Sequence, residues 1–191
     1  MSEPIEPRCM IDTNVLQYAI FGAVGYPGTR PDHRLLFDSS LDLVRRLKRI
    51  RISAITWSEI HRNIRKPHFT VIREWQMRMI VVPVTEEIAT LAAALLSVKT
   101  GQERTCPRCL NSLQTAPCKA CNAVLPKSSH LADALILSTA EIRNDVEVLY
   151  SLDGGVKSYV DQGHVHNCVV RRPPNPNGPL FEQASEAEAS P

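Results

Sequence analysis

Residues 9 to 20 read CMIDTNVLQYAI and contain a short apolar run, then an acid, then a second apolar segment. The run from Cys9 to Ile11 is typical of a buried β-strand, and Val15 to Ile20 is typical of one or two helical turns. The first part of the chain is therefore predicted to be a strand that ends at Asp12, followed directly by a helix.

The same alternation continues through most of the chain. Residues 21–33 are rich in Gly and Pro and are expected to form a loop. Helices are expected over residues 35–47, 56–65, 67–78, 86–99 and 129–142, and strands over residues 51–55, 79–84, 146–149 and 165–170. Strands that alternate with helices predict an α/β protein with a parallel sheet covered on both faces.

Length and composition indicate one main domain. A chain of 191 residues with 43% hydrophobic content can bury a core and carry a small appendage. No stretch approaches the roughly 20 apolar residues of a membrane span, and Met1 to Pro4 lacks the pattern of a signal peptide. We therefore expect a cytoplasmic protein with a domain over residues 1–172. The tail, residues 173–191, is mostly Pro, Asn, Gly, Glu, Ser and Ala and is predicted to be disordered.

The net charge of +2 hides two groups of basic residues. Such groups can contact phosphates, although a solvated helix face explains either group equally well. The first group is Arg45, Arg46, Lys48, Arg49 and Arg51, and the second is Arg62, Arg65 and Lys66.

Four carboxylates are expected at one edge of the predicted sheet, because ligand sites of parallel α/β sheets form outside the carboxyl ends of the strands. Asp12, Glu59 and Asp153 follow predicted strands, whereas Asp133 lies inside an apolar helical stretch. Each has a structural alternative. Asp12 can cap the following helix, Asp153 can form a turn before Gly154, Glu59 can complete a capping box with Thr56, and Asp133 can form a buried salt bridge.

The joint placement of the four acids favours a metal site. Carboxylates gathered at one edge repel each other, and Mg2+ or Mn2+ would neutralise them with the oxygen ligands that these ions prefer. Such a site suits metal-assisted hydrolysis of phosphodiesters. Asn14 and Ser151 lie close to two of the acids in sequence, where they can orient water or hold the carboxylates, or can simply form turn hydrogen bonds.

These residues resemble the PIN-domain family at four places, which are Met10 to Asn14, Ser58-Glu59, Asp133 to Ile136 and Ser151 to Asp153. The likeness covers most of residues 8 to 170. It implies a three-layer α/β/α fold with a central parallel sheet and a Mg2+- or Mn2+-dependent ribonuclease, as in VapC-like toxins and ribosomal-RNA processing enzymes. It also implies that Asp12, Glu59, Asp133 and Asp153 bind the metal. Compact toxins of the family generally lack a Cys-rich insert and a tail such as those found here.

Residues 101–127 interrupt the alternation and contain two C-x2-C pairs, which are Cys106, Cys109, Cys118 and Cys121. Two such pairs are the ligand set of a tetrahedral zinc site, and disulfides are disfavoured in a reducing compartment. We therefore predict an inserted, zinc-ribbon-like module with structural Zn2+. The module ends shortly before Asp133, so it can aid substrate recognition, serve the structure alone, or dock a protein.

The leading functional hypothesis is a metal-dependent endoribonuclease in which the zinc module aids structure or recognition of RNA. A DNA or flap nuclease with the same acids is one alternative. A non-cleaving module that binds RNA or protein on a PIN-like scaffold is another. An antitoxin-like protein or the ribosome is a further candidate partner, and the sequence leaves the oligomeric state open.

Overall fold

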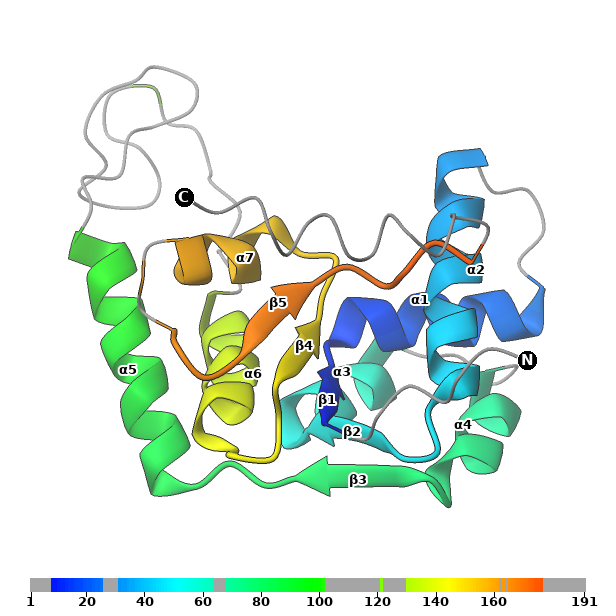
Figure 1. Cartoon of the computed structure of the whole chain (residues 1–191), viewed down its shortest axis with the longest axis horizontal. Coiled ribbons are helices and arrows are strands. Elements are labelled where there is room, and N and C mark those ends of the chain that lie inside the picture. Colours follow the sequence, from blue (N-terminus) through cyan, green and yellow to red (C-terminus); the bar gives the residue numbers. More distant parts are fainter. Residues whose placement is uncertain are drawn as a thin grey trace.

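Helices and strands alternate along the chain in the computed structural model, shown in Figure 1. The structure describes residues 8–25, 31–63, 68–101, 121, 130–161, 163 and 165–176. In chain order the elements are β1 (Cys9–Ile11), α1 (Thr13–Val24), α2 (Pro31–Arg46), β2 (Ile50–Ser53), α3 (Ala54–Asn63), α4 (Phe69–Gln76), β3 (Met79–Val82), α5 (Glu86–Gly101), α6 (His130–Ile142), β4 (Val148–Tyr150), α7 (Gly154–Asp161) and β5 (Val169–Arg171).

The paired strands are all parallel, as predicted. β1 pairs with β4, and β4 pairs with β5, so that Cys9 lies opposite Val148 and Val148 opposite Val169. β2 pairs with β3, and β1 contacts β2. The described strands therefore follow the order β3-β2-β1-β4-β5. The expected single sheet is present as a three-stranded piece and a two-stranded piece, since no ladder is formed between β1 and β2, both of which are described in full.

Helices cover both faces of β1. Cys9 and Ile11 belong to a hydrophobic cluster with residues of α1 to α4, whereas Met10 belongs to a second cluster with residues of α5, α6 and α7. Successive side chains of a strand point to opposite faces, so the two clusters are the two sides of the sheet. Each fully buried apolar side chain of this kind contributes about 1.5–3 kcal/mol. The arrangement has helices, strands and helices in three layers.

The loop expected over residues 21–33 is wrong for residues 21–24 and 31–33, which are helical, whereas residues 26–30 lie outside the described residues. α1 continues through Gly22 to Val24 and ends at Gly25, which has φ 70° in the left-handed region that glycine tolerates. A Cβ at Gly22 would lie 3.1 Å from the carbonyl oxygen of Phe37, so glycine permits the close packing of α1 on α2. α2 begins at Pro31, where the missing N–H of proline costs no hydrogen bond.

The buried carboxylate of Glu141, near the end of α6, holds the segment that leads into β5. It accepts the backbone N–H groups of His166, Asn167 and Cys168 at distances of 2.9 to 3.1 Å. Three donors satisfy a carboxylate that is only 6% exposed. Helix α6 therefore fixes the start of the edge strand β5.

Cys9 and Cys168 are buried, as expected for the two cysteines in strand regions. Burial raises the pKa of the Cys9 thiol to about 11 and that of the Cys168 thiol to about 12. Both thiols are therefore protonated at neutral pH, which agrees with ordinary core residues.

Several predicted features lie outside the described residues. These are most of the inserted module over residues 101–127, including Cys106, Cys109 and Cys118, and the tail beyond residue 176. Cys121 is described and is half-buried. Within the part of the chain that the structure describes, no helix has the length and apolar character needed to cross a membrane.

Candidate functional site

Asp12 lies at the point where the strand order reverses. Chain connections run from β1 towards β2 and β3 on one side and reach β4 and β5 on the other, and ligand sites of α/β sheets form outside the strand ends at such a point. The backbone N–H of Asp12 donates to Tyr150 O at 3.0 Å, which extends the β1–β4 ladder by one residue. The Asp12 side chain is therefore fixed at the carboxyl edge of the sheet.

The carboxylate of Asp12 is 3% exposed and is held by two donors. Its Oδ1 accepts the N–H of Thr13 at 2.6 Å, and its Oδ2 accepts the hydroxyl of Ser151 at 2.6 Å. The pKa of Asp12 is raised to about 6; burial is the largest cause, the two hydrogen bonds lower the pKa, and the charges of Asp153 and Glu59 contribute smaller increases. Asp12 does cap α1. Its carboxylate is nevertheless buried and subject to the negative charges of Asp153 and Glu59.

Glu59 is inside helix α3, so the structural alternative for this residue, a capping box over residues 56–59, is wrong. The helix begins at Ala54, and Ser53 Oγ accepts the N–H of Thr56 at 3.0 Å in the capping position. Glu59 Oε2 instead accepts the hydroxyl of Thr13 at 2.6 Å. Thr13 Oγ1 also lies 3.3 Å from Thr56 Oγ1, which is 3.1 Å from Ser53 Oγ.

Thr13 connects two of the predicted acids, a role that the sequence interpretation missed. Its backbone N–H binds Asp12, and its hydroxyl binds Glu59, which is 46 residues away. The signal in the sequence is a hydroxyl residue directly after the first acid. That signal becomes specific only once α3 is known to place Glu59 beside the start of α1.

Asp153, Ser151 and Asn14 form a second connected group at the end of β4. Ser151 Oγ accepts the N–H of Asp153 at 3.0 Å while its hydroxyl donates to Asp12. Asn14 Oδ1 accepts the N–H of Leu152 at 3.1 Å. The turn expected at residues 153–155 is the start of α7, where Asp153 Oδ1 accepts the N–H of Gly155 at 2.7 Å. Asn14 and Ser151 thus hold the segment that carries Asp153.

Asp133 lies in the first turn of α6 and approaches Asp153 beside Gly155. A Cβ at Gly155 would lie 3.0 Å from Asp153 Oδ1 and 3.5 Å from Asp133 Oδ2. Burial, and to a lesser extent the charge of Asp133, raises the pKa of Tyr159. The absence of a side chain at Gly155 leaves room for both carboxylates.

The four predicted acids are linked through these contacts but do not form a compact cluster. The links run from Glu59 through Thr13 to Asp12, and on through Ser151 to Asp153, which neighbours Asp133. Among the residues that the structure describes, no group of three His, Cys, Asp or Glu side chains is arranged to hold a metal ion.

The charge and the donor chemistry of the acids nevertheless fit a hard divalent cation. In the described part of the chain, no Lys or Arg forms a salt bridge with Asp12, Glu59 or Asp153. Carboxylate oxygens are the ligands that Mg2+ and Mn2+ prefer. A cation there would offset the like charges that raise the pKa of Asp12.

The first basic group predicted as a phosphate contact lies away from the acids. Lys48 and Arg49 precede β2 and are at the amino end of the sheet. Arg46 forms a salt bridge with Asp42, and Arg51 forms one with Asp145. Of the second group, Arg62 is exposed in the last turn of α3, and Arg65 and Lys66 lie outside the described residues.

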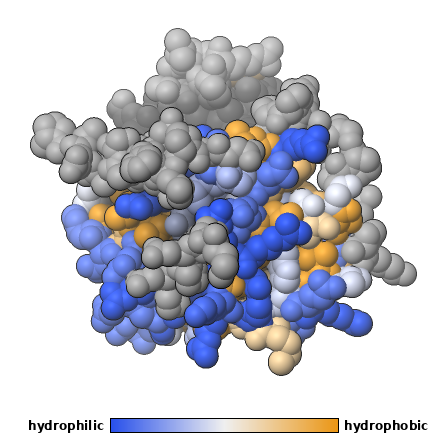
Figure 2. All heavy atoms as spheres, turned by 45° about the vertical axis from the view of Figure 1, so that its right-hand side comes forward, coloured by the Kyte–Doolittle hydropathy of each residue, from blue (hydrophilic) through white to orange (hydrophobic). Residues whose placement is uncertain are grey.

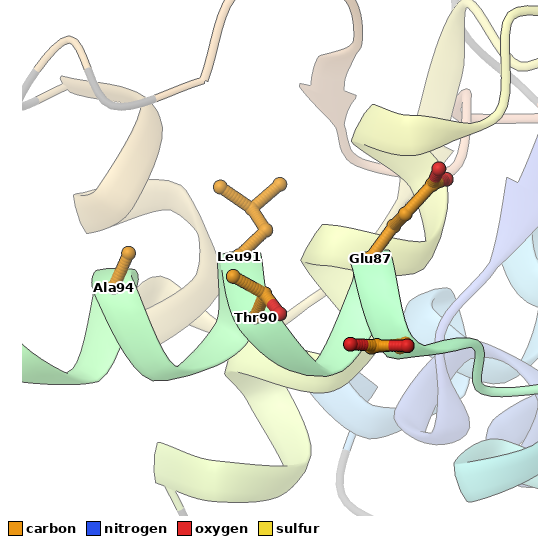
Figure 3. Close-up of a pocket in the computed structure, with 5 residues that line it drawn as sticks. Glu87, Thr90, Leu91 and Ala94 are labelled. Atoms are coloured by element: carbon orange, nitrogen blue, oxygen red, sulfur yellow. The ribbon is translucent and has the colours of Figure 1, made fainter.

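A hollow of about 480 Å3 on α5 also lies apart from the acids. Figure 3 shows its lining along one side of the helix, formed by Glu86, Glu87, Thr90, Leu91 and Ala94. On the face shown in Figure 2, hydrophobic residues form separate patches between hydrophilic ones. The hollow contains none of the residues predicted from the sequence, so we assign it no role in the site.

Comparison with known proteins gives little further information. No family model matches the sequence, and no curated protein matches it. Among solved structures, the chain is similar to the crystal structure of VapBC2 from Rickettsia felis bound to a DNA fragment from their promoter. The identity is 14%, the match covers 86% of this chain and 97% of that chain, and the TM-score is 0.47. A likeness at this level assigns neither a family nor an activity, and the functional interpretation therefore rests on the residues of the site.

Proposed function

We propose that the protein is a Mg2+- or Mn2+-dependent endoribonuclease whose catalytic acids are Asp12, Glu59, Asp133 and Asp153. The observation that carries the proposal is the state of Asp12. It is a buried carboxylate at the carboxyl edge of β1, with a pKa raised to about 6 mainly by burial and in part by the charges of Asp153 and Glu59. A buried carboxylate with a raised pKa at a strand end is characteristic of functional sites, because a fold gains no stability from it.

The side chains around the acids have distinct roles in this proposal. Asp12, Glu59, Asp133 and Asp153 would hold the divalent cation, which supplies charge neutralisation and activation of water for attack on a phosphodiester. Ser151 orients Asp12 and the backbone of Asp153. Asn14 fixes Leu152, the residue between Ser151 and Asp153. Such outer contacts set the positions of ligands and support their affinity for metal.

The inserted cysteines have a separate role in the proposal. Cys106, Cys109, Cys118 and Cys121 bind one structural Zn2+, since four thiolates leave no open coordination position for substrate. The insert enters the domain just before α6, which carries Asp133 in its first turn. We propose that the zinc module supports this helix and contributes to the recognition of RNA.

Cleavage assays with the purified full chain test the activity. Labelled single-stranded RNA and DNA of the same sequence are incubated with Mn2+, with EDTA, and with the variants Asp12→Asn and Asp38→Asn. Asp38 is an exposed acid of α2 and serves as the matched control. We expect RNA cleavage that needs Mn2+, falls more than about a hundredfold in Asp12→Asn, and is unchanged in Asp38→Asn.

The other outcomes identify the alternatives. Tight RNA binding without cleavage under any condition would contradict the nuclease proposal and indicate a binding module. Cleavage of DNA in preference to RNA would contradict the ribonuclease assignment while leaving the acids in place. Full cleavage by Asp12→Asn would mean that the active site lies elsewhere.

A further inference from the structure

We propose that Arg171 and Arg172, at the carboxyl end of β5, bind backbone phosphates of the RNA strand beside the acidic site. The inference rests on the proposed ribonuclease function and adds the surface by which the substrate is held. The Arg171/Arg172 pair takes the role of phosphate contact, which the sequence left open for the basic group that contains Lys48 and Arg49.

The two arginines are at the correct edge of the sheet. Arg171 is the last residue of β5 and lies opposite Tyr150 in the parallel register. Its carbonyl oxygen accepts the N–H of Ser151 at 2.9 Å, and the Ser151 hydroxyl binds Asp12. The backbone of Arg171 is therefore one hydrogen bond away from a residue that contacts the buried acid.

Lys48 and Arg49 are at the opposite edge. They directly precede β2, whereas the acids follow the strands. A strand rises about 3.3 Å per residue, so the four residues of β2 separate the two edges by more than about 10 Å. A nucleic-acid strand positioned at the acids would meet Arg171 and Arg172 before it met Lys48 and Arg49.

The charges of Arg171 and Arg172 are available to a ligand. Both side chains are exposed. Within the described residues, neither forms a salt bridge, whereas Arg8, Arg46, Arg51 and Arg143 each pair with an acid. Two adjacent cations at the rim of an acidic site are not needed for stability, because they are not partnered by the fold.

The chemistry of arginine suits a phosphodiester. A guanidinium presents a planar set of donors that can bind two phosphate oxygens at once, and it keeps its charge at every physiological pH. The acids would repel the RNA backbone, so a cationic contact next to them is needed to hold the strand in place. Glu141 fixes the segment before β5, and Pro173 after it is buried, so the pair is presented from a strand end that is held on both sides.

A binding experiment with matched variants tests the inference. In the full-length Asp12→Asn protein, which binds without cutting under the proposed function, the pair is changed by Arg171→Ala and Arg172→Ala. The control carries Lys48→Ala and Arg49→Ala, which remove the same charge from exposed positions at the other edge. Affinity for labelled single-stranded RNA is measured by fluorescence anisotropy between 50 and 200 mM KCl, a range of about fourfold in salt.

We expect the Arg171/Arg172 variant to bind about tenfold more weakly or worse at low salt. The slope of log K against log salt should become shallower by about 1.4, which corresponds to two lost phosphate contacts on a single strand. The Lys48/Arg49 control should keep its slope. A second variant with Arg171→Gln and Arg172→Gln keeps polar side chains at both exposed positions and should show the same shallower slope, so it tests the inference even if the alanine variant does not fold; Arg171→Lys with Arg172→Lys should retain the slope, because it keeps both charges.

Equal slopes for the alanine variant and the control would overturn the inference. That result would also follow if the pair binds an acidic protein segment instead of RNA. The failure of the parent proposal has a different signature, because the chain with Asp12 intact would then not cleave RNA with Mn2+. If the intact chain cleaves RNA and the salt slope of the Arg171/Arg172 variant is unchanged, the proposed phosphate site is rejected and the ribonuclease proposal stands.

Discussion

Replacing Asp12 by Asn should stabilise the metal-free protein while it abolishes cleavage. The carboxylate is buried and lies near Asp153 and Glu59, so its ionised form is unfavourable in the folded state. Asn has nearly the same shape, carries no charge, and can still accept the N–H of Thr13 through its Oδ1. The stability gained by this change measures how strongly the empty site opposes folding.

The magnitude follows from the pKa of Asp12, which rises from 3.8 to about 6 on folding. One pKa unit corresponds to about 1.4 kcal/mol, so ionised Asp12 costs about 3 kcal/mol at pH 8. Because the pKa of Asp12 is higher in the folded than in the unfolded state, protonation of Asp12 stabilises the fold. This stabilisation is fully present below pH 3.8 and is lost as the pH rises through 6. The advantage of Asp12→Asn should therefore grow from about 1 kcal/mol at pH 4.5 to about 3 kcal/mol at pH 8.

Added Mn2+ should reverse this order. A ligand at one thousand times its Kd stabilises the folded state by about 4.1 kcal/mol, which exceeds the advantage of about 3 kcal/mol that Asp12→Asn has at pH 8, and the variant should lose most of that gain. The wild-type protein should become at least as stable as the variant in saturating Mn2+. A metal ligand is expected to lower the folding stability of the metal-free protein and to raise that of the Mn2+-bound protein. A helix cap is not expected to do so.

Urea unfolding followed by circular dichroism, at pH 4.5 and pH 8 with EDTA or Mn2+, measures these differences. Asp38→Asn is the control, because Asp38 is exposed and its change should alter stability by less than about 0.5 kcal/mol at either pH. An advantage of Asp12→Asn that does not change between the two pH values would refute the reasoning. So would equal stabilisation of the wild type and the variant by Mn2+.

Two further predictions concern residues around the site. Thr13→Val removes the hydroxyl that binds Glu59 and should weaken Mn2+ binding about tenfold to a hundredfold by calorimetry; Thr13→Ser should restore it, and Thr139→Val, which removes a buried hydroxyl bonded to Leu135 O, should leave it unchanged. Equal affinities in all variants would exclude a positioning role for Thr13. Elemental analysis of the full chain should find about one zinc per molecule, which Cys106→Ser should release with a loss of thermal stability; zinc retained by that variant would contradict the four-cysteine site.

The sequence predicts the ends of β1 and β4 to within one residue because burial and chemistry agree there, whereas β2 and β3 each end two residues before the predicted position. The apolar run from Cys9 to Ile11 is buried on both faces, and a change to an acid at Asp12 marks its end. The same contrast identifies Asp153 at the end of β4. Local pattern is sufficient at these positions, since both the hydrophobic run and the polar residue that ends it are adjacent in the chain.

The predictions that failed depend on neighbours distant in sequence. Gly22 and Gly25 are ordinary loop signals until α2 is known to pack on α1, where Gly22 meets Phe37. Glu59 matches a capping box until Ser53 is seen to cap the helix one turn earlier. The partner of Arg51 is Asp145, 94 residues away, and no local rule indicates that pairing.

The antiparallel pair of α5 and α6 has a consequence for how this chain can vary. The helices pack together through Ala92, Leu95, Ala134 and Leu137, and Figure 1 shows them running in opposite directions. The connecting segment, residues 102–129, holds 28 residues (129 minus 101), where helix pairs commonly use about 2–8. Lengthening a connection from four to 28 residues costs only about 1.7 kcal/mol in closure entropy. The chain entropy of a long connection is therefore a minor obstacle to carrying an extra module at this junction.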